Sequence, residues 1–274
     1  MTPSISVSHL SKTYGSTVAV NDLSFTVHPG QVLGVLGANG SGKTTTLKAL
    51  LGLIDHQGDV KILDFDTRTE RTQMLKHVAF ISDTNTLPNW MTALQAVEVM
   101  NDLHPHFNAP QAIASLQKTT IAPTTKIKDM SKGMVVQLHL ALVLAVNARV
   151  LILDEPTLGL DILYRRHFYD TLINEYMTEE RTIVITTHQL EEFENLLTDV
   201  LLIKDGKSLL NTSVDTVHNT YTWVDGVHPH ALDVRTSVLR HSTSLIKSSD
   251  ANGAPTIARP TMSDIFAALA KESV

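Results

Sequence analysis

Apolar residues recur in two different patterns along the chain. Near the start, Ile5 and Val7, and later Leu23, Phe25 and Val27, alternate with polar residues, a spacing that predicts strands with one buried face. Continuous apolar runs predict further, buried strands at 31–37, 76–82, 149–156, 181–188 and 199–206. The run at 149–156 has the composition of a parallel strand that is covered on both faces.

Helical spacing separates these runs. We expect a helix at 43–53, mainly helical structure over 84–149 and another helix at 162–177. The apolar anchors of the last helix are Leu163, Leu172, Ile173 and Tyr176. Because buried strands and helices alternate along the chain, the pattern predicts an α/β fold with a largely parallel sheet.

The pattern weakens after Gly206. Residues 207–260 are rich in Ser, Thr and His and show little periodicity. Helical spacing returns in the tail, where the apolar positions are Ile265, Ala268 and Leu269. The residues suited to cap that helix are Thr261 and Ser263. We therefore expect a main domain over 1–206, with a helical subdomain at about 84–149, and a small C-terminal extension over 207–274.

Composition narrows the class of protein. Of 274 residues, 43% are hydrophobic and 18% charged, which allows a sizeable core and disfavours disorder. The net charge of -6 disfavours non-specific nucleic-acid binding, and the lack of cysteine excludes disulfides and thiolate metal sites. No apolar run reaches the length of about 18 residues that a membrane span needs, and residues 1–15 lack the apolar core of a signal peptide. We expect a cytoplasmic protein that is free to dock on a membrane protein.

A glycine-rich loop at 37–44, GANGSGKT, carries the clearest chemistry. It fits G-x-x-x-x-G-K-[ST] and lies between a predicted strand and a predicted helix. Glycines let successive N–H groups cradle phosphate oxygens, and the helix N-terminus adds partial positive charge. Lys43 is placed to reach the outer phosphates and Thr44 to bind Mg²⁺. The predicted nucleotide-binding residues of the loop are Gly37, Asn39, Gly40, Ser41, Gly42, Lys43, Thr44 and Thr45. The alternative, a glycine turn that binds nothing, is disfavoured by this context.

Two acidic residues follow the apolar run VLIL at 150–153. A buried strand that ends in an acid delivers a carboxylate to a metal, so Asp154 is a predicted Mg²⁺ ligand, acting through water. Glu155 lies one residue further and is a candidate general base for a water that attacks the γ-phosphate. Two exposed carboxylates at a strand end are the alternative, which loses weight beside the loop at 37–44. The sequence therefore predicts a nucleoside triphosphate site with Mg²⁺.

Further motifs occur in a fixed order: KTYG at 12–15, the phosphate loop, SKGM at 131–134, LDEPTLGLD at 153–161 and TTHQLEE at 186–192. In this order the chain resembles an ATP-binding cassette (ABC) ATPase subunit over residues 4–206. The resemblance implies that Tyr14 stacks on adenine, that Asp161 lies in a loop at the dimer interface and that His188 contacts the γ-phosphate, so that Lys43, Glu155 and His188 form the catalytic set. Taken alone, Tyr14, Asp161 and His188 each have an ordinary interpretation. They could be a strand aromatic, a helix cap and a polar surface histidine, respectively.

Two motifs depart from the family pattern. Asp83 stands where the family usually has a glutamine that contacts Mg²⁺. A carboxylate also ligates Mg²⁺, while the alternative is a loop residue whose role a water takes. The signature sequence, usually Leu-Ser-Gly-Gly-Gln, is here Met130 followed by Ser131, Lys132, Gly133 and Met134. Ser131 and Gly133, which contact phosphate across the dimer in the family, remain.

The resemblance also implies architecture and partners. The expected fold class is α/β: a P-loop NTPase core with a mainly parallel sheet, an N-terminal antiparallel β region, a helical subdomain and a small C-terminal extension. Two cassettes, from identical or different chains, would close head to tail around two ATP molecules and drive a separate transmembrane permease from the inner face of the membrane. Four residues of the helical subdomain are candidates for docking on the permease or for the helix core: Trp90, Met91, Leu94 and Val97.

The tail at 260–269, PTMSDIFAAL, resembles the end of exporter cassettes and favours export. The alternatives are a soluble ABC-type ATPase that acts on ribosomes or DNA, and a regulatory cassette not engaged in transport. Intact Lys43, Asp154, Glu155 and His188 disfavour the regulatory cassette. The order of the motifs disfavours a small-molecule kinase that uses the same loop.

Overall fold

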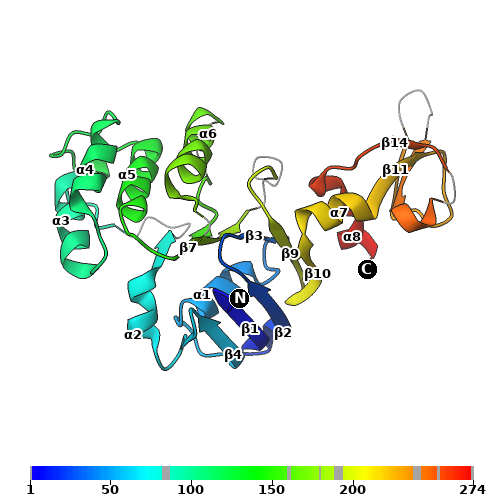
Figure 1. The fold of residues 1–274 in the computed structure, drawn as a ribbon, viewed down its shortest axis with the longest axis horizontal. Helices are drawn as coiled ribbons and strands as arrows, with labels where there is room; N and C mark the ends of the chain where they lie inside the picture. Colours follow the sequence, from blue (N-terminus) through cyan, green and yellow to red (C-terminus); the bar gives the residue numbers. More distant parts are fainter. Residues whose placement is uncertain are drawn as a thin grey trace.

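The computed structural model describes residues 2–81, 87–158, 162–178, 180–187, 194–236, 242–251 and 254–272. At its centre lies a six-stranded sheet in the order β10-β9-β3-β8-β7-β6 (Figure 1). Its strands are β3 (Val32–Leu36), β6 (Val78–Ile81), β7 (Val150–Asp154), β8 (Thr182–Thr186), β9 (Asp199–Lys204) and β10 (Lys207–Ser213). All pairs are parallel except β9–β10. The predicted α/β class with a mainly parallel sheet is confirmed.

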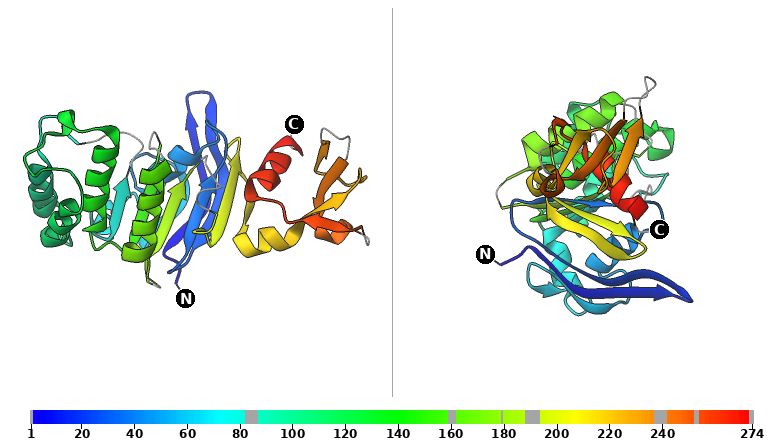
Figure 2. Two further views of the ribbon diagram at one scale, coloured as in Figure 1. Left: turned by 90° about the horizontal axis from the view of Figure 1, so that it is seen from above. Right: turned by 90° about the vertical axis from the view of Figure 1, so that its right-hand side faces the viewer.

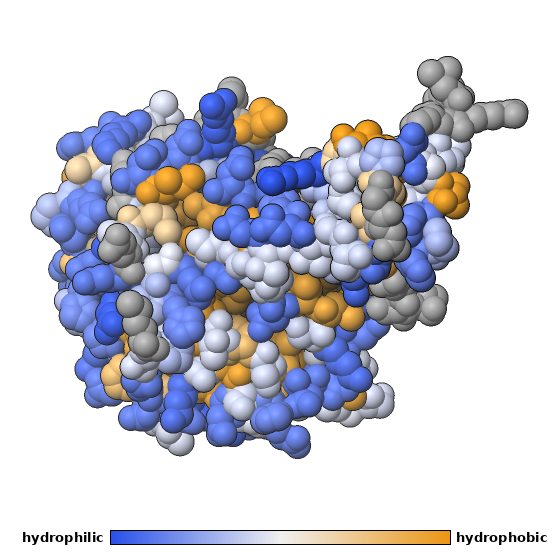
Figure 3. Space-filling view, turned by 45° about the vertical axis from the view of Figure 1, so that its right-hand side comes forward, coloured by the Kyte–Doolittle hydropathy of each residue, from blue (hydrophilic) through white to orange (hydrophobic). Residues whose placement is uncertain are grey.

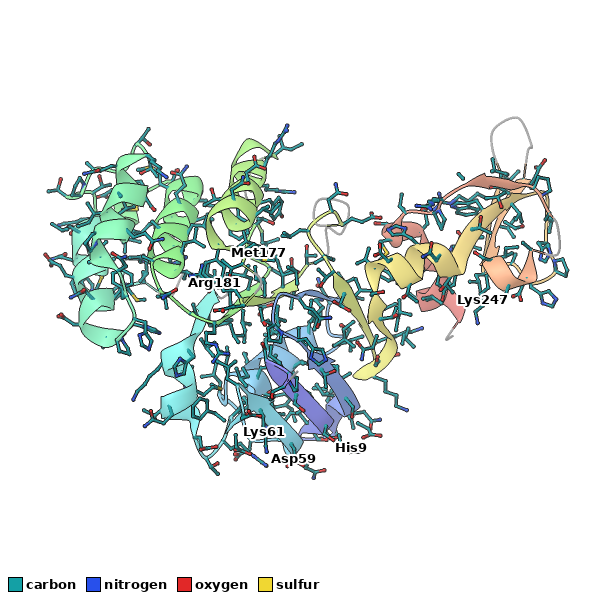
Figure 4. The ribbon with its side chains drawn as sticks, in the orientation of Figure 1. His9, Asp59, Lys61, Met177, Arg181 and Lys247 are labelled. Carbon is teal, nitrogen blue, oxygen red and sulfur yellow. The ribbon has the colours of Figure 1, made fainter. Side chains whose placement is uncertain are left out.

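A second sheet packs beneath the first, in the order β2-β1-β4-β5. It comprises β1 (Ile5–Tyr14), β2 (Thr17–Val27), β4 (Gln57–Ile62) and β5 (Phe65–Asp66), and every pair in it is antiparallel. The alternating residues of β1 and β2 pair in register, Ile5 with Val27 and Val7 with Phe25. Three polar residues of β1 and β4 are labelled in Figure 4, on the side of this sheet that is turned away from the central sheet: His9, Asp59 and Lys61.

The central sheet is covered on both faces because buried side chains alternate along its strands. On β7, Val150 and Ile152 join a core with the second sheet and with α1 (Lys43–Leu50). Leu151 and Leu153 point to the other face, against α5 (Lys132–Leu144) and α6 (Ile162–Thr171). The prediction of a doubly covered strand at 149–156 is therefore confirmed.

Helices form a layer beside this core (Figures 1 and 2). They are α3 (Ala93–Leu103), α4 (Ala109–Gln117) and α5, with a short 3-10 turn at Ile127–Asp129. The short helix α2 (Arg71–Met74) and the 3-10 turn at Leu75–His77 lie apart from this layer, and Met74 packs into the core with the second sheet. A capping box of Thr92 and Gln95 begins α3, and Asn108 caps α4. A separate apolar cluster holds α3, α4 and α5 together, as expected for a helical subdomain.

Helix α5 is buried on two sides. Leu138, Ala141, Leu142 and Ala145 face the helical cluster, while Leu140, Val143 and Leu144 face the central sheet. After α6 the chain continues as a π-helical turn over Leu172–Tyr176. Leu172 and Tyr176 are fully buried, but Ile173 is 43% exposed, because it follows Leu172 directly and so lies on a different side of the helix. The prediction of apolar anchors is confirmed for Leu172 and Tyr176 and wrong for Ile173, and the side chain of Leu163 lies outside the described residues.

The C-terminal residues build a third sheet, in the order β12-β13-β11-β14, which projects from the main body beyond β10 (Figure 1). Its elements are α7 (Val214–Thr220), β11 (Tyr221–Asp225), β12 (Asp233–Thr236), β13 (Ser242–Lys247), a 3-10 turn at Ser248–Asp250, β14 (Thr256–Ala258) and α8 (Met262–Glu272). The Thr261 Oγ1 accepts from the Asp264 N–H at 3.2 Å, so Thr261 is the predicted cap of α8 that the structure selects.

The position of the boundary between the two parts stays a prediction. The hairpin of β9 and β10 crosses residue 206 within one sheet, which favours a boundary after Ser213. In the described part of the chain, no helix combines the length and apolar character that crossing a membrane requires. One face of the molecule is mainly hydrophilic, with apolar side chains in separate patches (Figure 3).

Candidate functional site

A cavity of about 760 Å³ opens beside the end of β3 and the start of α1. This volume is in the range of about 300–1,000 Å³ typical of small-molecule sites. Most of the predicted nucleotide-binding residues gather there. The lining residues are Tyr14, Ala19, Asn39, Gly40, Gly42, Lys43, Thr44, Thr45, Glu155 and Leu158.

The loop between β3 and α1 needs its glycines. Gly37, Gly40 and Gly42 have φ angles of 149°, 82° and 113°, in the region that side-chain-bearing residues rarely adopt. A Cβ on Gly37 would lie 2.3 Å from the carbonyl oxygen of Ile203, and one on Gly42 2.5 Å from that of Ala19. No described side chain caps α1 at Gly42, so the first N–H groups of the helix are available to an anion.

Lys43 folds back over this loop. Its Nζ donates to the Gly37 carbonyl at 2.7 Å and to the Ala38 carbonyl at 3.2 Å. Burial lowers the pKa of Lys43, and the carboxylates of Glu155 and Asp154 act in the opposite direction. The ammonium group thus lies between the loop carbonyls and two acids, where phosphate oxygens would replace the carbonyls as partners.

The two acids sit at the carboxyl end of β7. Asp154 is buried, and its Oδ1 accepts a hydrogen bond of 2.6 Å from Thr186 Oγ1 at the end of β8. Glu155 has a left-handed φ of 47°, and its N–H donates to the same Thr186 Oγ1 at 3.0 Å. The buried acid and the cavity-lining acid predicted from the sequence are therefore placed side by side.

Tyr14 lies at the end of β1 and is 46% exposed where it lines the cavity. The Nζ of Lys12 lies 5.0 Å from the centroid of its ring. An exposed aromatic face at the mouth of a phosphate cavity is suited to stacking on a base.

The signature residues lie elsewhere. Ser131 is the N-cap of α5, and its Oγ accepts from the Met134 N–H at 3.2 Å. Neither these two nor Lys132 and Gly133 line the cavity. Ser131 and Lys132 are exposed, so the start of α5 faces outward from the chain that carries it.

Three predicted site residues, Asp83, Asp161 and His188, lie outside the described residues. Of the docking candidates, Trp90 and Leu94 are 66% and 39% exposed. Met91 and Val97 are buried in the helical cluster, which favours the core reading for them.

Sequence reasoning missed three residues of the site. Ala19 and Leu158 line the cavity, and Thr186 bonds both acids. Leu158 carried a signal, because it follows the two acids by only a few residues. The sequence places the Thr186 hydroxyl at the end of a predicted parallel strand. It does not show that this strand lies next to β7, so it could not predict the contact with the two acids.

Comparison with known proteins agrees with the resemblance to ABC ATPase subunits. The family model for ABC transporters matches residues 20–158. The chain is 26% identical over 217 residues to the ABC transporter ATP-binding protein YtrB of Bacillus subtilis, covering 79% of this chain and 74% of that protein. It is 32% identical over 210 residues to the Nod factor export ATP-binding protein I of Burkholderia lata, covering 73% and 68% of the two chains.

Solved structures share the fold. One described as the ATP binding subunit of an ABC transporter aligns with a TM-score of 0.73 at 22% identity, covering 79% of this chain and 92% of that one. The ATP-binding cassette MJ0796, in a dimeric post-hydrolysis state bound to ADP and Pi, aligns with a TM-score of 0.66 at 21% identity, covering 77% and 98%.

Proposed function

The chain belongs to the ABC transporter family as an ATP-hydrolysing, ATP-binding subunit, and from this premise we propose that it drives a separate membrane permease. The observation that carries the ATP-hydrolysing part of the proposal is the convergence of the uncapped start of α1, Lys43 and Glu155 on one cavity. These residues supply the phosphate-binding loop, the cation and the candidate base of a phosphoryl-transfer site.

In this site the loop N–H groups and Lys43 hold the phosphates, and Tyr14 stacks on adenine. Glu155 accepts a proton from the water whose oxygen attacks the γ-phosphorus. As that bond forms, the bond from the γ-phosphorus to the bridging oxygen breaks, and ADP and phosphate leave. Lys43 balances the negative charge that develops on the transferred group.

The side chains present fit a magnesium ion. Thr44 lines the cavity, and Asp154 supplies a buried carboxylate next to Glu155, which lines the same cavity. Both are hard oxygen donors, and Mg²⁺ binds with few protein ligands beside phosphates and water. No group of three or more His, Cys, Asp or Glu residues suited to a metal occurs in the described part of the chain. When bound, Mg²⁺ neutralises phosphate charge.

The outward-facing start of α5 supports a dimer. Because Ser131 is exposed and does not line the cavity of its own chain, we infer that its hydroxyl and the helix N-terminus meet the nucleotide of a second cassette. Asp161 and His188 stay predicted members of that closed site. The partner cassette is a second copy of this chain or a different one.

The helical subdomain is the proposed contact with the permease. The exposed side chain of Trp90 precedes α3, and a groove of about 310 Å³ lies between α3, α4 and the segment that follows α4. Such a contact would hold the cassette at the inner face of a membrane. Export is the proposed direction, supported by the tail motif and by the likeness to a relative named for Nod factor export.

Two experiments test this function. Lys43→Ala should abolish Mg²⁺-dependent ATP hydrolysis, whereas Lys48→Ala, an exposed position on the same helix, should leave it unchanged. Loss of activity in both variants, or in neither, contradicts the role of Lys43. Affinity purification from membranes should recover a protein with several membrane spans. Recovery of ribosomes or DNA, or of no membrane protein, would favour the soluble or regulatory cassette instead.

A further inference from the structure

One threonine hydroxyl joins both acids at the end of β7. The register of the parallel pair β7–β8 places Thr186 opposite Asp154, and both side chains are buried. The Thr186 Oγ1 lies 2.6 Å from Asp154 Oδ1 and 3.0 Å from the backbone nitrogen of Glu155. Because an ionised carboxylate only accepts and a backbone N–H only donates, the hydroxyl donates to Asp154 and accepts from Glu155.

The same threonine supports an uncommon backbone conformation. The φ of Glu155 is 47°, which residues other than glycine rarely adopt and which persists only where the surroundings determine it. Besides its bond to the hydroxyl, the Glu155 N–H donates to the Thr186 carbonyl at 3.2 Å. The direction in which the Glu155 side chain leaves the strand therefore depends on Thr186.

We propose that Thr186 is a positioning residue for ATP hydrolysis, one that aims Asp154 at the magnesium position and Glu155 at the attacking water. By binding Oδ1, the hydroxyl sets the direction of the other oxygen of Asp154. Thr186 does not line the cavity, so it acts through its two neighbours and not on the nucleotide. The inference rests on the proposed roles of the two acids.

Two matched pairs of variants isolate the hydroxyl. Thr186→Val keeps the shape of the wild-type side chain without its hydroxyl, and Thr186→Ala differs from Thr186→Ser in the same way. Thr182→Val is the control, because Thr182 is buried at the other end of the same strand. Its Oγ1 bonds to Ser4 Oγ at 2.8 Å, so the control also loses a buried hydrogen bond.

We expect Thr186→Val to lower kcat by about 10–100-fold, as is usual when a group that orients a metal ligand is removed, and to change the KM for ATP by less than about 3-fold. The second readout is the affinity for a non-hydrolysable ATP analogue, measured calorimetrically with and without Mg²⁺. The enhancement by Mg²⁺ should fall about 10-fold in Thr186→Val, with the metal-free affinity unchanged. Thr186→Ser and Thr182→Val should behave as wild type in both measurements.

Wild-type kcat and wild-type Mg²⁺ enhancement in Thr186→Val would overturn the inference. So would equal losses in Thr182→Val, which would indicate general destabilisation. If Thr186→Val does not fold, Thr186→Ser and Thr186→Ala replace it as the test pair. Equal kcat and equal Mg²⁺ enhancement in those two variants would also refute the role of the hydroxyl. Absence of hydrolysis in the unsubstituted protein would contradict the proposed function, while the Mg²⁺-dependent binding comparison would still test Thr186.

Discussion

Replacing Ser131 with alanine separates the two roles open to the start of α5, a helix cap and a ligand for the partner's ATP. Ser213 provides a control, because it also caps a helix, α7; its Oγ makes one further bond, to Thr216 Oγ1 at 2.7 Å. In each case the serine Oγ accepts from the N–H three residues later at 3.2 Å. Ser213 lies in the C-terminal part of the chain, away from the nucleotide cavity.

The two roles differ in magnitude and in what they affect. Loss of a serine cap lowers the free energy of unfolding by about 1 kcal/mol, or roughly 2–4 °C in Tm for a chain of this size. Ser131→Ala and Ser213→Ala should share that effect. A hydrogen bond to a charged phosphate contributes about 1.5–3 kcal/mol, so its loss weakens ATP-dependent association by about 10–100-fold per site. In a dimer of two Ser131→Ala chains both sites lose the bond, and the dissociation constant should rise by about 10²–10⁴-fold.

Sedimentation of the dimer measures the second effect directly. Both substitutions are introduced into Glu155→Gln protein, so that ATP is not consumed, and the dimer dissociation constant is measured with Mg²⁺ and ATP. We expect a weaker dimer only for Ser131→Ala, together with similar small decreases in Tm for both. Equal dimer affinity in the two variants would show that Ser131 is a cap alone and would refute the dimer model drawn from α5.

Three further predictions concern the base, three partly buried histidines and the end of α6. Glu155→Gln should lower kcat by about 10²–10⁴-fold while ATP stays bound; turnover at the wild-type rate would exclude Glu155 as the base. Burial lowers the pKa values of His77, His104 and His139 from 6.5, so near that pH the unfolded chain binds more protons than the folded protein. The contribution to stability is therefore complete above pH 6.5 and is lost as the pH falls through the folded-state values; urea midpoints should be lower at pH 5.5 than at pH 7.5, less so in His139→Leu, and equal midpoints would contradict this. Tyr176 is fully buried, its hydroxyl donates to the Ala148 carbonyl at 3.0 Å and its pKa is raised by burial to about 12. Tyr176→Phe leaves that carbonyl unpaired and should lower the free energy of unfolding by about 1–3 kcal/mol, measured by urea unfolding. Arg181, labelled in Figure 4, stacks on the same ring with its Cζ 4.4 Å from the centroid and should keep the phenylalanine in place; an unchanged midpoint would refute the value assigned to the hydroxyl.

Short-range patterns predicted the phosphate loop and every strand of the central sheet except β10, because each of these depends on neighbouring residues. The apolar run of β7 fixes its own two buried faces, and the glycines at 37–42 fix their own φ angles. By contrast, β4 contains Gly58 and Asp59, which are poor strand formers, and forms through its pairing with β1 about fifty residues earlier. Its pattern alone gives little indication of a strand.

The C-terminal sheet and Thr186 were missed for a related reason. The strands β12 and β14 are short and largely exposed, so they have no clear alternation. Trp223 and Leu245 are buried by packing against the core that α8 completes, which no local pattern shows. Thr186 meets Asp154 only because β7 and β8 are adjacent and in register, a relation that depends on the order of strands and not on sequence distance.

Met134 stands in the signature sequence where the family usually has glutamine, and the packing of α5 gives this difference a physical explanation. Lys132 is exposed, but Met134 is partly buried and packs against the cluster that joins α3, α4 and α5. A methionine there stabilises the first turn of α5 on the helical subdomain, where a glutamine would present a polar group. The other side of α5 packs against Leu151 and Leu153 of β7, the strand that ends at Asp154. Because packed cores do not deform continuously, a shift of Ser131 toward a partner's nucleotide must move α5 together with α3 and α4. We therefore expect the packing of Met134 to couple any movement of Ser131 to the helical subdomain, with the hydroxyl of Ser131 retained.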